Sequence, residues 1–361
     1  MKRKISKQTK INWLTYGLVI VAFVVMQLAG SFGLLSYSIR GQLVPICVYI
    51  VLAVSLNLVV GVSGELSLGH AGFMGVGAFV GAVASTMLQG LIPEPAVRLA
   101  VCMLVGGILA GLMGVVIGIP VLRLRGDYLA IVTLAFGEIL RNIFHNLYIG
   151  VDDAGMHMAL GDDAFTLATG GKMILSGPRG TTGIQTIASF PAGFILVLIT
   201  LFVVLNLINS KEGRAIKACR DNRIAAESVG INATAFKLKA FVVSAFLAGM
   251  AGALFGLNYA SVSAAKFSFT TSIDILVYVV LGGMGNILGS VISATLLYAL
   301  PETRVMRSLQ DYRMIIYAVV LIVVMLCTWS PKVKGALDVA AQWFKQKVAR
   351  IFKKKEVGSD E

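Results

Sequence analysis

The sequence predicts an all-α protein: a polytopic transmembrane helix bundle in which some helices are broken by glycine or re-enter the membrane. Of the 361 residues, 57% are hydrophobic and only 14% are charged, whereas soluble domains carry about 25% charged residues. Apolar segments of about 20 residues, the length that crosses a bilayer, recur along the chain. The net charge of +13 gathers in the flanks of these segments, which indicates membrane orientation and anionic lipid rather than nucleic acid.

The predicted organisation is a basic N-terminus (1–13), a transmembrane domain (14–330) and a basic amphipathic tail (331–361) on the inner membrane surface. The first apolar run is long for a signal peptide, so we expect an uncleaved first helix. Unbroken spans are expected at Leu14–Ser38, Leu43–Val62, Ala96–Leu122, Tyr128–Tyr148, Phe190–Ile208, Ala240–Val262 and Met314–Trp329. Small residues recur every fourth position and predict close helix packing at Gly106, Ala110, Gly114 and Gly118, and at Ala248, Gly252 and Gly256.

Two further apolar segments are interrupted by glycine. Leu66–Leu91 has glycines from Gly69 to Gly77, and Ile273–Leu300 is split by Gly282–Asn286. The second segment would reach only about 42 Å as a helix, too short for two crossings of about 30 Å each. We therefore expect a re-entrant hairpin there, with eight crossings elsewhere. Because non-helical backbone at membrane depth must be buried in protein or reached by water, both breaks point to a central pathway.

Charge predicts the orientation of the loops. Lys211–Lys239 contains seven basic and three acidic residues, so residues 210–239 and both termini should be cytoplasmic. Residues 150–189, which hold four aspartates, should be external. Within the cytoplasmic loop, a short helix of small residues ended by glycine suits docking in a groove of another protein. Its predicted members are Arg223, Ile224, Ala225, Ala226, Glu227 and Gly230. An ordinary basic loop that only orients the chain is the alternative.

Residues for chemistry are sparse. No G-x-x-x-x-G-K-[ST] phosphate loop is present, and the three histidines and four cysteines show no ligand spacing. We therefore expect no catalytic residue, no metal and no cofactor, and an enzyme is the least favoured class. Glu138 and Arg141 should form a local pair. For Asp274 a helix cap is the first expectation and a gate the second.

A substrate path is predicted between the two glycine breaks. Its candidate residues are Ser67, His70, Gly72, Asp274, Gly282, Gly283 and Asn286. Glu65 and His70 flank the first break and would either satisfy unwound backbone or line the path. Bulk added at Gly283 should block transport through close approach. An ion-coupled secondary transporter would usually carry carboxylates in its core, whereas here they lie at the ends of spans.

The collinear motifs resemble the LivM-type permeases of high-affinity branched-chain amino acid ABC importers over roughly Leu43 to Trp329. These motifs are Gly64–Phe73, Arg125–Leu134, Ser176–Gly180, the basic loop, Ser244–Ala253 and Val280–Asn286. Two departures stand out. Ile224-Ala225-Ala226 replaces the Glu-Ala-Ala of many ABC importers, and the external insertion Val151–Ile174 has no expected role beyond contact with a binding protein.

The resemblance implies a permease subunit in the bacterial cell membrane that works with a LivH-type permease, two ATPase subunits and an external binding protein. Leucine, isoleucine or valine would be the cargo. The permease itself would not hydrolyse ATP. Urea or short amides, carried by the same importer class, are the alternative cargo.

Overall fold

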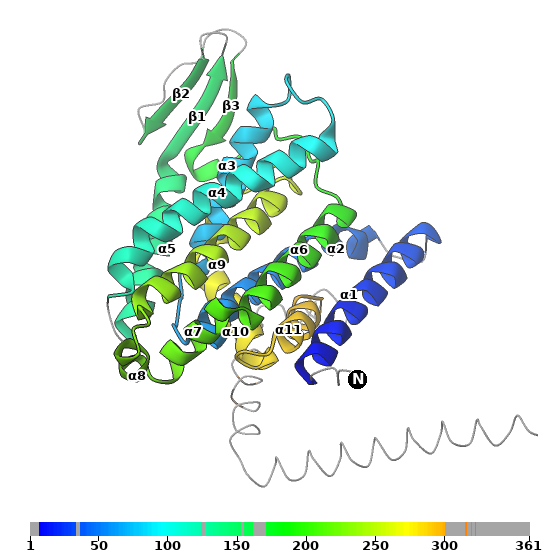
Figure 1. Cartoon of the computed structure of the whole chain (residues 1–361). Helices are drawn as coiled ribbons and strands as arrows, with labels where there is room; N and C mark the ends of the chain where they lie inside the picture. Colours follow the sequence, from blue (N-terminus) through cyan, green and yellow to red (C-terminus); the bar gives the residue numbers. More distant parts are fainter. Residues whose placement is uncertain are drawn as a thin grey trace, which may run out of the picture. The chain divides into compact units, whose positions relative to one another are not determined.

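The computed structural model describes residues 7–33, 37–123, 127–152, 155–161 and 171–299, with residues 315, 319 and 322. In this part of the chain the predicted helical bundle is confirmed (Figure 1). Apart from those last three positions, the predicted span Met314–Trp329 lies outside the described residues, as does the predicted tail, residues 331–361.

Long helices build the bundle. They are α1 (Lys7–Ser31), α2 (Tyr37–Asn57), α3 (His70–Met87), α4 (Pro95–Val121), α5 (Asp127–Asn146), α6 (Phe190–Asn209) and α9 (Ala233–Gly256). A π-helical segment, η1 (Leu58–Ser63), continues α2. Within the described residues, six helices are long and apolar enough to cross a membrane, counting α2 and η1 as one, and α5 is not among them. The chain is thus a multi-pass membrane protein.

The predicted small-residue faces of α4 and α9 are confirmed as sites of close helix packing, and α3 joins them. A Cβ atom added to Gly77 would lie 1.9 Å from the carbonyl oxygen of Gly249, and one added to Gly249 would lie 2.6 Å from that of Gly106. No side chain fits at Gly77 or Gly249. Backbones therefore touch directly where α3, α4 and α9 meet, the type of packing by which membrane helices associate.

The first predicted break is present next to Glu65 and His70, which were expected to flank it, but it is shorter than the glycine-rich stretch. The non-helical backbone is Gly64–Gly69, and α3 then runs without interruption through Gly72, Gly75 and Gly77. Those glycines provide close approach rather than a break, since a Cβ atom on Gly72 would lie 3.0 Å from the Cα atom of Gly137 on α5.

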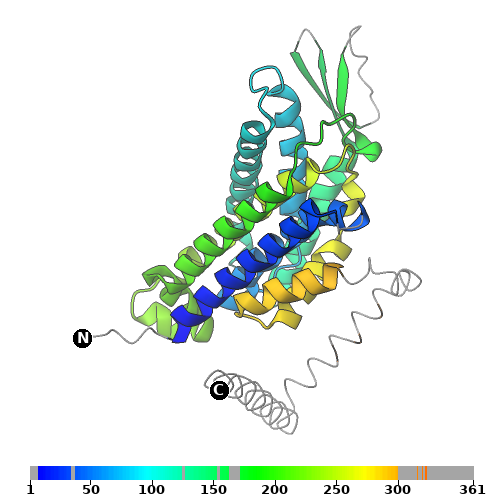
Figure 2. The same ribbon diagram turned by 90° about the vertical axis from the view of Figure 1, so that its right-hand side faces the viewer.

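The second break is confirmed as two short helices, α10 (Phe269–Gly282) and α11 (Ile287–Ala299), which pack against each other (Figure 2). Gly283 and Gly285 turn the chain with φ of 89° and 83°, a region that favours glycine. The predicted cap at Asp274 is wrong. Ser268 precedes the first turn of α10, and Asp274 is buried within that helix.

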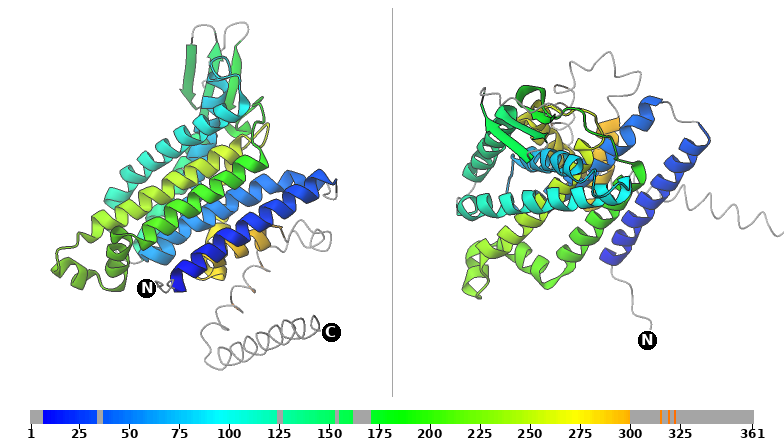
Figure 3. Two further views of the ribbon diagram at one scale, coloured as in Figure 1. Left: turned by 45° about the vertical axis from the view of Figure 1, so that its right-hand side comes forward. Right: turned by 90° about the horizontal axis from the view of Figure 1, so that it is seen from above.

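A small antiparallel sheet interrupts the helical pattern between α5 and α6. Its strands are β1 (Leu147–Asp152), β2 (Gly155–Leu160) and β3 (Lys172–Ser176), in the order β2-β1-β3. This sheet falls in the predicted external segment and was not anticipated. It lies at one end of the bundle, while the start of α1 and helices α7 (Lys211–Asp221) and α8 (Arg223–Ser228) lie at the other (Figures 1 and 3).

Candidate functional site

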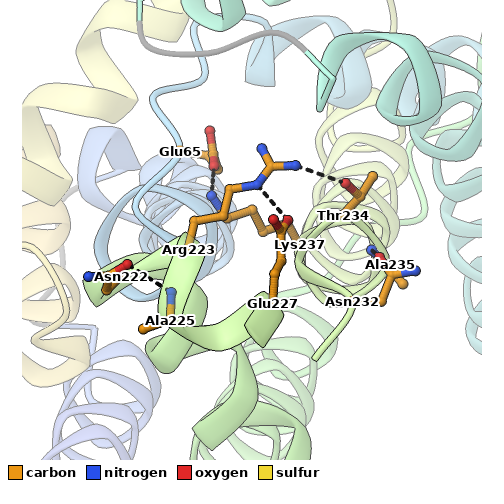
Figure 4. Close-up of polar contacts among 9 residues, drawn as sticks. All are labelled: Glu65, Asn222, Arg223, Ala225, Glu227, Asn232, Thr234, Ala235 and Lys237. Carbon is orange, nitrogen blue, oxygen red and sulfur yellow. Dashed lines mark hydrogen bonds and ion pairs between the residues drawn. The ribbon is translucent and has the colours of Figure 1, made fainter. Parts of the chain in front are cut away.

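Helices α7, α8 and α9 follow one another at the end of the bundle that holds the basic segment 210–239, called here the basic end. Each of the three begins at a polar cap. The Ser210 hydroxyl accepts a hydrogen bond from the Gly213 N–H at 3.1 Å, Asn222 accepts one from Ala225 at 3.0 Å, and Asn232 accepts one from Ala235 at 3.1 Å. Such caps typically contribute about 1 kcal/mol each. The predicted cytoplasmic loop is therefore a defined helical segment, whose α8–α9 part appears in Figure 4.

The two alanines of α8 face in opposite directions. Ala226 is buried against Cys219 of α7 and Ala233 of α9, whereas Ala225 is exposed. Burial also raises the pKa of the Cys219 thiol. Ala226 is small because α8 packs against its neighbouring helices at this position. It is therefore not available to a groove in another protein, contrary to the sequence prediction. The exposed residues of α8 are Ile224, Ala225, Glu227 and Ser228.

Two large apolar side chains project from the outer face of α8. Ile224 is 82% exposed and Val229, just after the helix, is 73% exposed. The predicted stop at Gly230 is confirmed: its φ is 85°, and Ile231 N–H donates back to the Ala226 carbonyl at 3.1 Å. These bonds close the helix end in the manner of a Schellman motif. Ile224 thus lies on a helix closed at both ends, and Val229 lies directly after that helix.

Charged residues on α8 are engaged within the chain. The Arg223 Nε atom lies 2.8 Å from a Glu227 carboxylate oxygen, and its guanidinium also donates to the Thr234 hydroxyl at 3.4 Å (Figure 4). Glu227 thus has a basic partner on its own helix, at the i,i+4 spacing that stabilises exposed helices.

Two basic side chains connect this segment to the first non-helical stretch. Arg220 of α7 donates to the Gly61 carbonyl at 2.9 Å, and its alkyl stem fills the space where Gly64 would carry a side chain. Lys237 of α9 forms an ion pair with Glu65, which is itself in the break (Figure 4). The helices at the basic end are therefore joined directly to residues 61–65.

The predicted path residues of the first break face several helices. His70 Nε2 lies 2.9 Å from the Ser55 hydroxyl of α2, and the Ser55 carbonyl accepts from Ser244 of α9 at 2.6 Å. Ser67 is buried, and its hydroxyl has no hydrogen-bond partner among the described residues. The Ala71 N–H donates to Ser272, two residues from Asp274, at 3.1 Å. This one bond connects the start of α3 to α10.

The predicted path residues of the second break rest on the end of α2. Asn57 is fully buried, and its side-chain oxygen accepts from the Gly285 N–H at 2.7 Å. Its amide nitrogen donates to the Ser290 hydroxyl at 2.7 Å and to the Asn286 carbonyl at 3.2 Å. The end of α2 thus bonds to both breaks, through Ser55 on one side and Asn57 on the other.

Two glycines at the second break differ in the room that they leave. A Cβ atom at Gly282 would lie 2.5 Å from backbone atoms of Gly289 and Ser290, whereas one at Gly283 would meet nothing closer than 3.7 Å. Close approach therefore occurs at Gly282. The expectation of close approach at Gly283 is wrong, because that glycine is required by its φ rather than by space.

Sequence reasoning missed Ser55, Asn57, Arg220 and Lys237. A signal existed for Asn57, because a lone amide inside an apolar span needs a partner in the bundle. None existed for the pairing of Lys237 with Glu65, which are far apart in the chain. The predicted pair of Glu138 and Arg141 is confirmed at 2.6 Å.

Comparison with known proteins connects this architecture to transport. Residues 38–325 match the family described as branched-chain amino acid transport system / permease component. The permease protein LivM of Escherichia coli, named for high-affinity branched-chain amino acid transport, is 36% identical over 295 residues, 79% of this chain and 67% of that protein.

Two further relatives are more distant. The ribose import permease protein RbsC of Haemophilus influenzae is 27% identical, covering 76% of this chain and 80% of that protein. The LivH permease of Salmonella typhimurium is 24% identical, covering 69% and 79%. No solved structure matches significantly. The chain belongs to the family of permease components of branched-chain amino acid transport systems.

Proposed function

We propose that the chain is the membrane permease subunit of an ATP-driven importer that carries leucine, isoleucine and valine into a bacterial cell. Family membership and the similarity to LivM support the cargo class. Coupling to an ATPase is supported by the exposed part of α8, where Ile224 and, directly after the helix, Val229 are exposed beside a capped helix. A helix that lays apolar side chains into a groove of another protein is a recurring mode of recognition.

The assembly would contain a second, LivH-type permease, two ATPase subunits and an external binding protein that delivers the substrate. ATP hydrolysis would take place on the ATPase subunits. Helices α7 and α8 would lie in the cytoplasm with both termini, and the segment 150–189 with its sheet would be external. The seven basic residues of Lys211–Lys239 support this orientation.

Energy would pass from the ATPase to the membrane through contacts at the basic end of the bundle. An ATPase that moves α8 also moves α7 and α9, because Ala226 is packed between them. Arg220 and Lys237 then act on Gly61 and Glu65, and Asn57, one helical turn before Gly61, holds the turn between α10 and α11. A displacement at α8 would thus reach both breaks, near Ser67, His70, Gly72 and Asp274 and near Gly282, Gly283 and Asn286.

The cargo has alternatives within the same importer class. Urea or short amides remain candidates, and the similarity to a ribose permease adds sugars. In such systems much of the selectivity lies in the binding protein, so the permease needs only a low-affinity path. Helix ends at the two breaks offer N–H groups for a carboxylate and carbonyls for an ammonium group.

Uptake of labelled leucine by the reconstituted complex tests this function. We expect uptake to require ATP and the binding protein, and unlabelled isoleucine and valine to compete. Urea and ribose should not compete. Competition by ribose alone would assign the chain to sugar transport, and uptake driven by an ion gradient without ATP would contradict the importer class.

A further inference from the structure

The chain between β3 and α6 includes an irregular segment, residues 182–189, called here the strap (Figure 2). Its beginning is bonded to the sheet, because the Thr182 N–H donates to the Ile174 carbonyl of β3 at 3.0 Å. Its last part is bonded to the end of α9, because the Ala188 N–H donates at 3.2 Å to the carbonyl of Leu257, directly after that helix. The strap therefore connects the sheet, the end of α9 and the start of α6.

The middle of the strap covers a buried arginine. Arg98, at the start of α4, is only 2% exposed. Its Nη2 atom donates to the Gln185 side-chain oxygen at 2.6 Å, and its Nη1 atom donates to the Ile92 carbonyl at 3.4 Å. Its Nε atom is buried without a hydrogen-bond partner among the described residues. None of the ion pairs in that part of the chain includes Arg98, so its guanidinium is buried there without a carboxylate.

Gln185 covers this charge with a neutral group. Gln185 is exposed, and in the described part of the chain its bond to Arg98 is the one side-chain hydrogen bond between the strap and α4. Buried charges are normally paired with opposite charges, because removing a charge from water is costly. A glutamate has the length of a glutamine and would supply a stronger bond, with both partners charged. The covered arrangement is therefore held less firmly than this position allows.

The strap also ties two helices together at the end of the bundle that carries the sheet. Arg98 connects the strap to the start of α4, and Leu257 connects it to the end of α9. Loss of the bond to Gln185 would free α4 while the strap stays attached to α9 by backbone bonds. Near the start of the strap, Gly183 has a φ of 66°, and nothing lies within 4 Å of the place of an added Cβ atom, so the chain has room to bend there.

We infer that the hydrogen bond between Arg98 and Gln185 is a latch, and that the strap lifts from α4 when this bond breaks. Water that reaches the guanidinium offsets the lost bond, so a small bias selects between the closed and the lifted strap. A protein that binds the sheet would supply such a bias, because the chain continues from β3 through Thr181 into the strap. The latch is a property of this chain, and its use in transport rests on the proposed function.

A native cysteine reports the opening. Cys102 lies one helical turn beyond Arg98 in α4, is completely buried, and hydrogen-bonds to Ser85 of α3. A maleimide reaches this thiol only after the cover around Arg98 has moved. Cys47 of α2, which is 5% exposed, is a second buried thiol and reports general loosening of the bundle.

The rate at which a maleimide labels Cys102 in the full chain in membranes tests the latch, with Cys47 followed in the same sample by mass spectrometry. We expect Gln185→Glu to slow the labelling severalfold by pairing with Arg98, and Gln185→Ala to speed it severalfold. Thr186→Ala, at the exposed neighbouring position, should leave the rate unchanged. Equal rates in the two Gln185 variants, no labelling in any variant, or a parallel change at Cys47 would overturn the latch.

Uptake tests whether the latch opens during transport. Gln185→Glu should lower leucine uptake severalfold in an assembled complex, and Thr186→Ala should not. Normal uptake by a Gln185→Glu complex whose labelling is slowed would show that transport proceeds with the strap closed, and would overturn this use of the latch. Absence of leucine uptake by the unmodified complex would instead refute the proposed cargo, because the labelling does not depend on it.

Discussion

Asn57 and Gly285, far apart in sequence, are joined by a hydrogen bond of 2.7 Å from the backbone N–H of Gly285 to the side-chain oxygen of Asn57. This bond fastens the turn between α10 and α11 to the end of α2. Asn57→Ala removes it together with the bond to the Ser290 hydroxyl, and each lost hydrogen bond typically costs about 1 kcal/mol. We expect the melting temperature of the purified protein to fall by several degrees.

Thr295→Val is the control for that measurement. Among the described residues the Thr295 hydroxyl bonds only to the Val291 carbonyl one turn back in α11, at 2.8 Å, so its loss leaves no distant group there unpaired. If Thr295→Val lowered the melting temperature as much as Asn57→Ala, the bond to Gly285 would contribute no more to stability than a local hydrogen bond.

The exposed face of α8 should be required for energy coupling. Ile224→Glu places a charge on the outer face without disturbing the contacts of Ala226, and we expect it to abolish substrate-stimulated ATP hydrolysis and uptake together. The matched control is Leu91→Glu in the connection between α3 and α4, where Leu91 is 79% exposed. If Ile224→Glu retained both activities in an assembled complex, α8 would be an orienting segment only.

Ala226→Arg is expected to act differently from Ile224→Glu. The arginine would have to enter the packed space between α7 and α9, where Ala226 contacts Cys219 and Ala233. Because burial keeps the Cys219 thiol protonated and inaccessible, its reaction with a maleimide reports whether α8 is seated. Cys219 should react quickly in the Ala226→Arg variant and slowly in both the unmodified chain and the Ile224→Glu variant, after Cys327 is replaced by Ser.

Arg220 should affect the yield of transport per ATP. Arg220→Met keeps an alkyl stem over Gly64 but removes the bond to the Gly61 carbonyl. We expect ATP hydrolysis to continue while leucine uptake per ATP falls. Arg214→Met on the same helix, where the arginine is exposed, should leave that ratio unchanged. Equal ratios in the two variants would exclude Arg220 as a mechanical connection.

Tight packing around α9 should make Gly252 intolerant of a methyl group. A Cβ atom there would lie 1.9 Å from the Met74 carbonyl oxygen, whereas one at Gly111 would meet its nearest neighbour at an ordinary 3.5 Å. Overpacking typically costs about 1–3 kcal/mol. Gly252→Ala should therefore lower the amount of folded protein and its melting temperature, and Gly111→Ala should change neither. Similar behaviour of the two variants would argue against direct backbone contact between α3 and α9.

Labelling with a membrane-impermeant maleimide should distinguish the two ends of the bundle. Single cysteines at Met158 of β2 and at Val229 after α8 are both well exposed in the chain. On whole cells we expect labelling at 158 and none at 229 until the membrane is opened. The reverse pattern would invert the proposed orientation.

The helices were predictable because a bilayer imposes a length and an apolar composition on each span, and glycine spacing marks where helices touch. The same rules overestimated the length of the first break, because a glycine inside a helix looks the same in sequence whether it breaks the helix or lets Gly137 approach. The direction of Ala226 was also beyond the pattern, since in a six-residue helix it depends on where α7 and α9 lie.

The sheet escaped prediction for another reason. Residues 147–176 contain short apolar runs divided by glycine and aspartate, and such runs fit a loop as well as a strand until the partner strands are known. The hydrogen bonds of Asn57 and Lys237 likewise depend on residues far along the chain, which a single sequence does not pair.

Besides its chain connections to α5 and α6, the sheet region contacts the bundle directly. Beyond β3, Gly180 packs against the Val262 carbonyl, and Thr181 exchanges hydrogen bonds of 3.0 and 2.9 Å with Val262, in the segment between α9 and α10. A force applied to the sheet therefore has a short route to the start of α10 that bypasses the whole length of α6. A protein that bound this sheet would thereby act on the hairpin of α10 and α11.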